Sequence, residues 1–178
     1  YGYFNPVRTA GPSVAAQKGA IAYLLRSIGT DSHRFPHTGS LRYAENTPHI
    51  PALALSNPDA DQVERILSEG VELVVRLTVD TSLVPAAQSA NVIAEIPGHA
   101  APEEVVVIGA HLDSWDLGTG AIDDGAGVGI TMAAMALIKE AGLTPRRTIR
   151  LVLWGAEEVG LLGAIAYRDR HQEALADH

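Results

Sequence analysis

The 178-residue sequence contains no cysteine, so disulfide bonds, thiolate nucleophiles and cysteine metal ligands are all excluded. Any metal bound by this chain must be held by histidine, aspartate or glutamate side chains. The lack of cysteine says little about the compartment, because exported bacterial proteins can lack it too. Aromatic residues make up only 5% of the chain, but 47% of its residues are hydrophobic, which is ample for a core. The composition therefore indicates a globular protein of one compact domain or two small ones.

Basic residues are also scarce: 13 Lys and Arg stand against 21 Asp and Glu, giving a formal net charge of -8. The arginines are dispersed along the chain, so we expect no nucleic-acid partner. Apolar runs are interrupted by Gly, Pro or charge before they reach the roughly 18 to 20 residues of a membrane helix, so we expect no membrane partner. The first residues, YGYFNPVRTAGPS, lack the basic and apolar regions of a signal peptide and do not begin with Met, so we expect this N-terminus not to be a natural start.

Two common enzyme motifs are absent from the sequence as well. No GxSxG elbow is present, which argues against a serine hydrolase. The glycine-rich stretch GTGAIDDGAG lacks the Lys and Ser/Thr of a phosphate-binding loop. The chemistry of this chain must therefore be sought in other residues.

The chain up to about residue 70 has the pattern of a small α/β module. Segments that favour helices and short apolar runs that favour strands follow one another there: a helix over 12–18, strands over 19–25 and 51–55, and a helix over 56–70. The last helix is the best marked, because Ser56 or Asn57 can cap its start and Gly70 can end it.

From residue 71 onward the pattern predicts a second module built on strands. Residues 71–79 alternate between hydrophobic and polar, as a strand with one wetter face does, and residues 91–96 alternate again. The runs VVVIGA (105–110) and IRLVLWG (149–155) are apolar on both faces, which is typical of parallel strands covered by helices. The segment 125–142 between them predicts a crossover helix. The unit is thus β-α-β, and the fold class is α/β.

Ionisable residues gather directly behind these two apolar strands. The carboxyl ends of parallel strands meet at one edge of a sheet, where α/β proteins place their ligand sites. Seven ionisable groups fall on this edge, and six of them are acidic: His111, Asp113, Asp116, Asp123, Asp124, Glu157 and Glu158. So many carboxylates repel one another unless some are far apart, protonated or neutralised by cations. A divalent metal is the simplest answer.

Two spacings within this group suggest roles. His111 and Asp113 are two residues apart on an extended chain and face the same side, so the Asp113 carboxylate can accept the imidazole N–H and fix the tautomer of a metal-binding histidine. Glu157 and Glu158 follow a strand end, where the backbone bends, so one can bind a metal while the other takes a proton from water. Nitrogen and carboxylate ligands without thiolate suit zinc best, with cobalt or manganese as alternatives.

These residues lie in stretches that resemble a known family. AHLDSWDLGTGAIDDGAG followed by TPRRTIRLVLWGAEEVGLLGAIAY resembles the co-catalytic zinc exopeptidases of peptidase family M28, most closely the carboxypeptidase Q branch with its inserted protease-associated domain. The resemblance implies that His111 binds one zinc, that Asp123 bridges two, and that Glu158 binds the second. It also implies that Glu157 is the general base, that Asp113 orients His111, and that a cis peptide precedes Asp124.

The resemblance also implies how the chain is organised. AAQKGAIAYLLRS and PHTG resemble the second half of the inserted domain, so residues 1–70 are expected to be its C-terminal part. Residues 71–178 then form the N-terminal part of the catalytic domain, a partial zinc-exopeptidase fold with a mixed, mainly parallel sheet. In the family an aspartate and a histidine further along complete the site. We therefore expect this chain to be an incomplete, inactive fragment. His171 and His178 are not expected to replace them, because one surface helix carries both away from the strand end.

The implied function is that of a metal-dependent exopeptidase or dipeptidase acting on small peptides, with recognition of the amino or the carboxyl terminus left open. A homodimer is left open too, and a periplasmic or secreted location follows only from the resemblance. The alternative is a non-catalytic protein-interaction module on the same scaffold. The retained acidic residues favour the peptidase, because a scaffold freed from catalysis has no physical reason to keep buried acids together.

Simpler interpretations exist for several residues. Glu157 and Glu158 could merely complement a helix dipole, and His111 could be a buried, satisfied histidine, but the grouping of HLD, DD and EE weakens both readings. For Asp124 we favour a structural role as the N-cap of the crossover helix. Trp115 could line a substrate pocket or pack over the glycine loop.

The remaining charged residues have no expected role in the site. Asp116 is left without an assignment. Four histidines near Pro or Gly in loops are expected to be non-catalytic: His33, His37, His49 and His99. Three arginines at the start of the second apolar strand are expected to be solvated charge: Arg146, Arg147 and Arg150.

Overall fold

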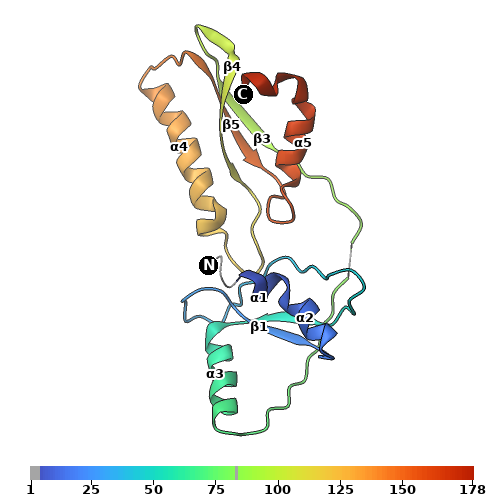
Figure 1. The fold of residues 1–178 in the computed structure, drawn as a ribbon. Coiled ribbons are helices and arrows are strands. Elements are labelled where there is room, and N and C mark those ends of the chain that lie inside the picture. The colour runs from blue at the N-terminus through green and yellow to red at the C-terminus, as the bar shows by residue number, and fades with distance from the viewer. Residues whose placement is uncertain (1–4, 83) are drawn as a thin grey trace. The chain divides into compact units, whose positions relative to one another are not determined.

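The computed structural model describes residues 5–82 and 84–178, which divide into two compact units (Figure 1). The first unit ends at Pro85 and also includes Trp115–Gly118. The second unit comprises Ala86–Ser114 and Thr119–His178. All the ionisable residues of the expected site except Asp116 therefore belong to the second unit.

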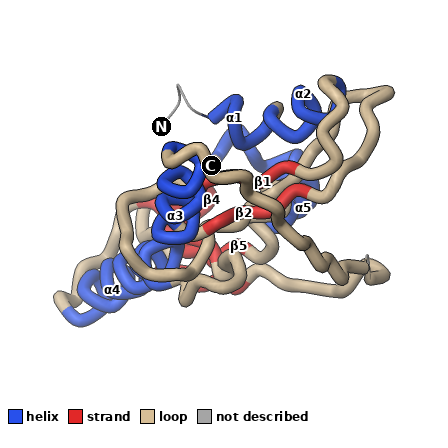
Figure 2. Tube along the Cα trace, turned by 90° about the horizontal axis from the view of Figure 1, so that it is seen from below, coloured by secondary structure: helices blue, strands red, loops and turns tan. Residues whose placement is uncertain are grey.

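The first unit contains the predicted helix, strand, strand and helix, preceded by a short helix that the sequence analysis did not predict. Its elements are α1 (Asn5–Thr9), α2 (Gly11–Gln17), β1 (Tyr23–Arg26), β2 (Ala52–Leu55) and α3 (Asn57–Ser68). β1 and β2 pair in parallel, and long loops join the elements (tan in Figure 2). Ser56 is the cap of α3, because its Oγ accepts the N–H of Asp59 at 3.2 Å. Gly70 follows the helix with a φ of 72°, a conformation that glycine adopts without strain.

The strand predicted over residues 71–79 does not form. Residues 71–82 and 84–91 carry neither helix nor strand, and Val74 is 83% exposed. A strand is stabilised by hydrogen bonds to a neighbouring strand, and among the described residues both sheets are made of other segments. The alternating pattern is a local property of the sequence, whereas the pairing that it requires is not.

The second unit is an α/β structure around a three-stranded mixed sheet. Its strands are β3 (Val92–Ile96), β4 (Ala101–His111) and β5 (Arg147–Trp154), in the order β3-β5-β4. β4 runs parallel to β5 and β3 runs antiparallel to it. The π-helical turn η1 (Ala121–Ala126) and helix α4 (Gly127–Glu140) connect β4 to β5, which confirms the predicted β-α-β unit. Helix α5 (Leu162–Arg170) and the 3-10 helix η2 (Gln172–Asp177) follow β5.

The central strand β5 is covered on both faces, which explains the apolar run Leu151–Trp154 in its second half. Leu151 and Leu153 are buried on the face that packs against α4, together with Ala110, Ile108, Val128 and Met135. Alternate residues point to the opposite face, where the Trp154 ring meets the Tyr167 ring of α5 edge-on at 5.3 Å. The helices α4 and α5 accordingly lie on opposite sides of the sheet (Figure 1). This packing holds β4 and β5 side by side, so that their carboxyl ends lie at the same edge of the sheet.

One helical stretch, Ala121–Glu140, is long and apolar enough to cross a membrane by length and composition, with a mean hydropathy of 1.4. The expectation that no segment reaches this limit is therefore wrong. That expectation treated each glycine and each charge as an interruption, whereas the mean hydropathy of this stretch stays high although it contains glycines and four charged residues near its ends, Asp123, Asp124, Lys139 and Glu140. The same test is passed by core helices of soluble proteins, and α4 packs Val128 and Met135 against the sheet.

Candidate metal centre

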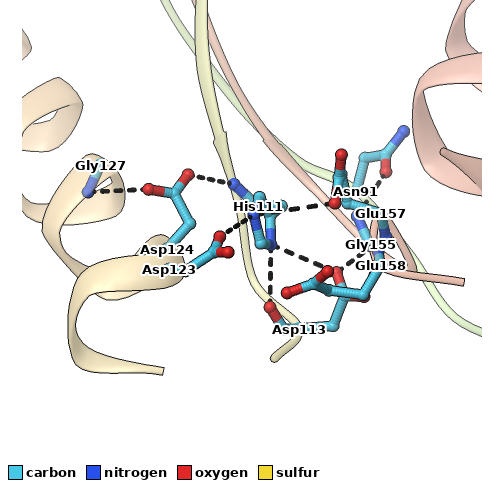
Figure 3. A network of polar contacts seen from close by, with 9 residues as sticks. All are labelled: Asn91, His111, Asp113, Asp123, Asp124, Gly127, Gly155, Glu157 and Glu158. Carbon is cyan, nitrogen blue, oxygen red and sulfur yellow. Dashed lines mark hydrogen bonds and ion pairs between the residues drawn. The ribbon is translucent and has the colours of Figure 1, made fainter. Parts of the chain in front are cut away.

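The ionisable residues lie at the carboxyl ends of β4 and β5, as the strand pattern predicts. β4 ends at His111, and β5 ends just before the turn that holds Glu157 and Glu158. Asp123 and Asp124 reach the same edge from the turn before α4. Figure 3 shows these two aspartates on one side of His111 and the two glutamates on the other.

Three of these side chains form a group that could hold a metal ion. His111, Asp123 and Glu158 each offer a ligand atom, and these atoms lie within 4.8 Å of one another. His111 Nε2 is 2.9 Å from Asp123 Oδ1 and 3.8 Å from Glu157 Oε2. The His111 side chain is only 12% exposed, whereas that of Asp123 is 72% exposed. One imidazole nitrogen with carboxylate oxygens and no sulfur is a donor set that fits zinc.

Asp113 holds the glutamate turn rather than the imidazole. Its Oδ1 accepts the backbone N–H of Glu157 at 2.9 Å, and its Oδ2 accepts that of Glu158 at 3.0 Å. His111 Nδ1 lies 2.8 Å from the backbone carbonyl oxygen of Asp113, but 3.8 Å from its Oδ1. A carbonyl oxygen can only accept, so Nδ1 carries a proton and a neutral imidazole presents its Nε2 lone pair to the metal group. The backbone carbonyl of Asp113, rather than its carboxylate as we expected, thus accepts the imidazole N–H and fixes the tautomer of His111.

The electrostatic environment of the site shifts two pKa values in opposite directions. Burial alone lowers the pKa of His111. The Asp113 carbonyl and the carboxylates of Glu157 and Asp123 together raise it by more than burial lowers it, so the pKa of His111 lies above the ordinary value. Burial raises the pKa of Asp113, but the N–H groups of Glu157 and Glu158 outweigh it, so this pKa lies below the ordinary value. The site therefore favours positive charge at its centre and keeps Asp113 ionised.

Asp124 connects the end of β4 to the start of α4. Its Oδ1 accepts the N–H of Gly127, the first residue of α4, at 3.0 Å, although the N-cap position that we expected Asp124 to occupy belongs to Ala126. Its Oδ2 accepts the backbone N–H of His111, also at 3.0 Å. Asp124 itself lies inside the π-helical turn, and Ala126 is the residue directly before α4. The peptide bond between Asp123 and Asp124 is cis, as the family resemblance implies.

A residue that the sequence analysis did not single out, Asn91, contacts both ends of the glutamate loop. Its Oδ1 accepts the N–H of Gly155 at 3.0 Å, and its Nδ2 donates to the carbonyl oxygen of Gly163 at 2.9 Å. Asn91 directly precedes β3, and the antiparallel register places the start of β3 beside the end of β5. Only knowledge of that pairing could have drawn attention to Asn91.

Arg150 is not the solvated residue that we expected. Its side chain is 17% exposed, and it donates hydrogen bonds to Glu95 on β3 and to the hydroxyl of Tyr167 on α5. It lies in the middle of β5, on the face that α5 covers. Arg147 does conform to the expectation, because it is 51% exposed and pairs with Glu104.

His171 and His178 do not lie on one continuous helix, contrary to the expectation. α5 ends at Arg170, and the following 3-10 helix folds back so that His178 Nε2 lies 2.9 Å from the Tyr167 hydroxyl. The ring of His171 stacks on that of Tyr167 at 4.0 Å. Within residues 5–82 and 84–178, the metal-ligand group includes neither histidine.

The four loop histidines have local partners outside the metal group. For example, His49 stacks on Tyr43 at 4.4 Å, and His99 Nδ1 lies 2.9 Å from the carbonyl oxygen of Pro145. Trp115 and Asp116 are part of the first unit. Their relation to the metal group therefore stays untested.

Comparisons with known proteins identify the family of this chain. Residues 91–177 match the model of peptidase family M28. The chain is 43% identical to carboxypeptidase Q of Homo sapiens over 171 residues, which cover 96% of this chain and 36% of that relative. It is 42% identical to carboxypeptidase Q of Rattus norvegicus over 178 residues, which cover 100% of this chain and 38% of the relative.

Solved structures give the same result. The crystal structure of a peptidase M28 precursor from Shewanella amazonensis SB2B matches with a TM-score of 0.93 and 49% identity, over 100% of this chain and 40% of that chain. An aminopeptidase from Aneurinibacillus sp. strain AM-1 matches with a TM-score of 0.51 over 89% of this chain and 38% of that chain, and at 24% identity it supports the fold alone.

The fold and sequence of this chain are those of the metallo-exopeptidase class. More narrowly, the chain belongs to peptidase family M28, and its curated relatives above are carboxypeptidases Q. The chain spans 36% of the length of the human relative and 40% of the Shewanella chain.

Proposed function

We propose that this chain supplies one part of a two-zinc site to an exopeptidase that hydrolyses small peptides. The observation that carries the proposal is the group of His111, Asp123 and Glu158 atoms within 4.8 Å, with Glu157 beside it. In this arrangement His111 and Asp123 would hold one zinc, and Asp123 and Glu158 would hold the other. Asp123 suits this role because one oxygen already faces His111 while most of the side chain is open to solvent.

Glu157 is the general base in this proposal. A zinc ion in such a site supplies a Lewis acid that makes water nucleophilic near neutral pH and polarises a peptide carbonyl. Glu157 Oε2, 3.8 Å from His111 Nε2, takes the proton from the attacking water and then passes it to the departing amine. Its backbone is held by Asp113, so the carboxylate is presented from a fixed turn. Asp113 thereby orients His111 through its carbonyl oxygen and the two glutamates through its carboxylate.

The residues of this chain give each zinc two ligands, whereas a catalytic zinc usually has three from the protein. The relatives are more than twice as long as this chain, which supports the proposal that the missing ligands lie in residues outside these 178. The chain alone then binds metal weakly and does not turn over peptides. We also propose that residues 1–70 belong to an inserted protease-associated part and residues 71–178 to a catalytic part; the match of the M28 model to residues 91–177 supports a peptidase domain in the second part.

We also propose a periplasmic or secreted location and small peptides as the partners. The description of the Shewanella relative as a precursor supports the location. The competing interaction-module function is disfavoured by the grouping of the His111, Asp123 and Glu158 ligand atoms within 4.8 Å, because neighbouring carboxylates repel one another and a site without a metal gains nothing from that repulsion.

The test is hydrolysis of free, N-blocked and C-blocked dipeptides by a form extended to the length of the relatives, with and without Glu157→Gln. The proposal expects kcat to fall at least about 100-fold in the variant while zinc stays bound. Unchanged turnover in Glu157→Gln, or no hydrolysis of any peptide by the extended form, would overturn it. Whichever blocked peptide is refused identifies the terminus that is recognised.

A further inference from the structure

The loop that carries both glutamates is closed at its base by three hydrogen bonds. The N–H of Gly163 donates to the carbonyl oxygen of Gly155 at 2.9 Å. The amide of Asn91 makes the other two, accepting from Gly155 at 3.0 Å and donating to Gly163 at 2.9 Å. Figure 3 shows Asn91 beside Gly155, next to the turn where Glu157 and Glu158 begin. One side chain from another strand thus ties the two ends of the loop together.

The fit at this base is tight. A Cβ on Gly163 would lie 2.3 Å from Asn91 Oδ1 and 2.4 Å from the carbonyl oxygen of Gly155, so only glycine is accommodated there. The contact also needs the chemistry of an asparagine. Its short side chain places one acceptor and one donor side by side, whereas an aspartate offers no donor and a glutamine is longer by a methylene.

The loop needs such external support because its backbone is unusual. Ala156 and Leu161, which flank the glutamates, have φ values of 54° and 60°, a left-handed region that residues other than glycine seldom occupy. Conformations of this kind persist where surrounding contacts determine them. Asp113 holds the middle of the loop through the Glu157 and Glu158 N–H groups, and Asn91 holds its two ends.

We propose that Asn91 is a positioning residue for the metal centre, acting through the loop Gly155–Gly163. Asn91 fixes both ends of the loop. It thereby orients the Glu158 side chain toward His111 and Asp123, and the Glu157 side chain toward the same metal centre. The inference rests on the proposed function for its consequence in metal binding. Its structural part, the restraint of the loop, is independent of that function.

The surroundings of Asn91 determine how a substitution at this position affects the structure. A cavity of about 250 Å³ adjoins it, bordered mainly by small side chains such as Ser89, Ala90, Ala156 and Ala166. Water can enter a space of this size and hydrate the N–H and C=O groups that a substitution sets free. Removal of the Asn91 amide therefore loosens the loop without leaving buried polar groups unsatisfied, and the unit stays folded.

The first experiment measures amide hydrogen exchange in the metal-free full chain, for the wild type, Asn91→Ala and Asn91→Asp. We expect exchange across residues 155–163 to speed up about 10-fold or more in Asn91→Ala, with a smaller change in the remaining sheet. Asn91→Asp keeps the acceptor for the Gly155 N–H but loses the donor to Gly163, so its loop exchange should be intermediate.

The matched control is Asn57→Asp in the first unit. The amide of Asn57 also bridges a loop, because its Nδ2 donates to the carbonyl oxygens of Gly29 and Asp31 at 3.1 and 3.3 Å. This control should speed exchange near residues 29–31 and leave residues 155–163 as in the wild type. Unchanged loop exchange in both Asn91 variants would overturn the proposal.

The second experiment measures zinc affinity by chelator competition in the form extended to the length of the relatives. Asn91→Ala and Asn91→Gln should bind zinc about 10- to 100-fold more weakly than the wild type, with altered absorption bands of the Co²⁺-substituted protein. Asn57→Asp should keep the wild-type affinity. Wild-type affinity in the Asn91 variants overturns the inference while the proposed function stands. If the wild type itself binds no zinc, the proposed function fails, and hydrogen exchange alone decides the role of Asn91.

Discussion

The carboxylate of Asp113 accepts the backbone N–H of Glu157 at 2.9 Å, and its other oxygen accepts the next N–H, that of Glu158, at 3.0 Å. A side chain that follows β4 thereby fixes the main chain that follows β5. Beyond the last backbone hydrogen bond, from the Leu112 N–H to the Trp154 carbonyl oxygen at 2.8 Å, the two parallel strand ends are joined by a charged group. The position of the two glutamates depends on this joint, which leads to the first prediction.

Substitution of Asp113 by Asn should weaken both the fold and the metal site. An amide has one acceptor oxygen, so its NH₂ group would face one of the two backbone N–H groups and leave it unsatisfied. We expect a loss of about 1 to 3 kcal/mol in the free energy of unfolding, measured by urea denaturation. Zinc affinity of the extended form should fall about 10-fold or more. Asp116→Asn is the control; equal effects of the two substitutions would contradict this account.

Arg150 should matter far more for stability than Arg147, although both lie on β5. Arg150→Met removes a side chain that is only 17% exposed and leaves the Glu95 carboxylate and the Tyr167 hydroxyl without their shared donor, which should cost about 1 to 3 kcal/mol. Arg147→Met removes an exposed ion pair and should cost under about 1 kcal/mol. The free energies of unfolding of the two variants decide this, and a ranking in the opposite order would show that the Arg150 network is not stabilising.

Asp124→Ala should affect both helix α4 and the metal centre. The Gly127 N–H loses its cap and the His111 N–H loses its acceptor, so we expect a destabilisation of about 1 to 2 kcal/mol together with weaker zinc binding. Ser56→Ala removes a comparable cap from α3 and should cost about 1 kcal/mol without any change in zinc affinity. Zinc affinity that is lowered equally by both variants would point to a general loss of stability instead.

The sequence predicts the second unit well because its signals are local. Apolar runs mark β4 and β5, the segment between them marks α4, and the residues after each strand end must meet at one edge. The acidic residues behind both strands could therefore be assigned to one edge before any coordinates, and the family resemblance then selects His111, Asp123 and Glu158 among them as metal ligands. The first unit is also predicted in outline, since the cap at Ser56 and the glycine at residue 70 delimit α3.

What the sequence does not reveal depends on contacts between distant segments. The alternation over residues 71–79 predicts a strand but cannot supply its partner. Arg150 was assigned to solvent because its burial depends on where α5 and the 3-10 helix return to the sheet. Asn91 could be recognised only from the register of β3 on β5. In each case a long-range pairing, not a residue preference, decides the outcome.

The account is tested most directly by the number of zinc ions retained per molecule after dialysis. Three samples are compared: this 178-residue chain, the form extended to the length of the relatives, and the extended form with Asp123→Asn. We predict about two zinc ions in the extended form, almost none in this chain, and a loss of both ions when the bridging carboxylate is replaced. Two tightly held ions in this chain alone, or in the Asp123→Asn form, would contradict the proposed ligand assignment.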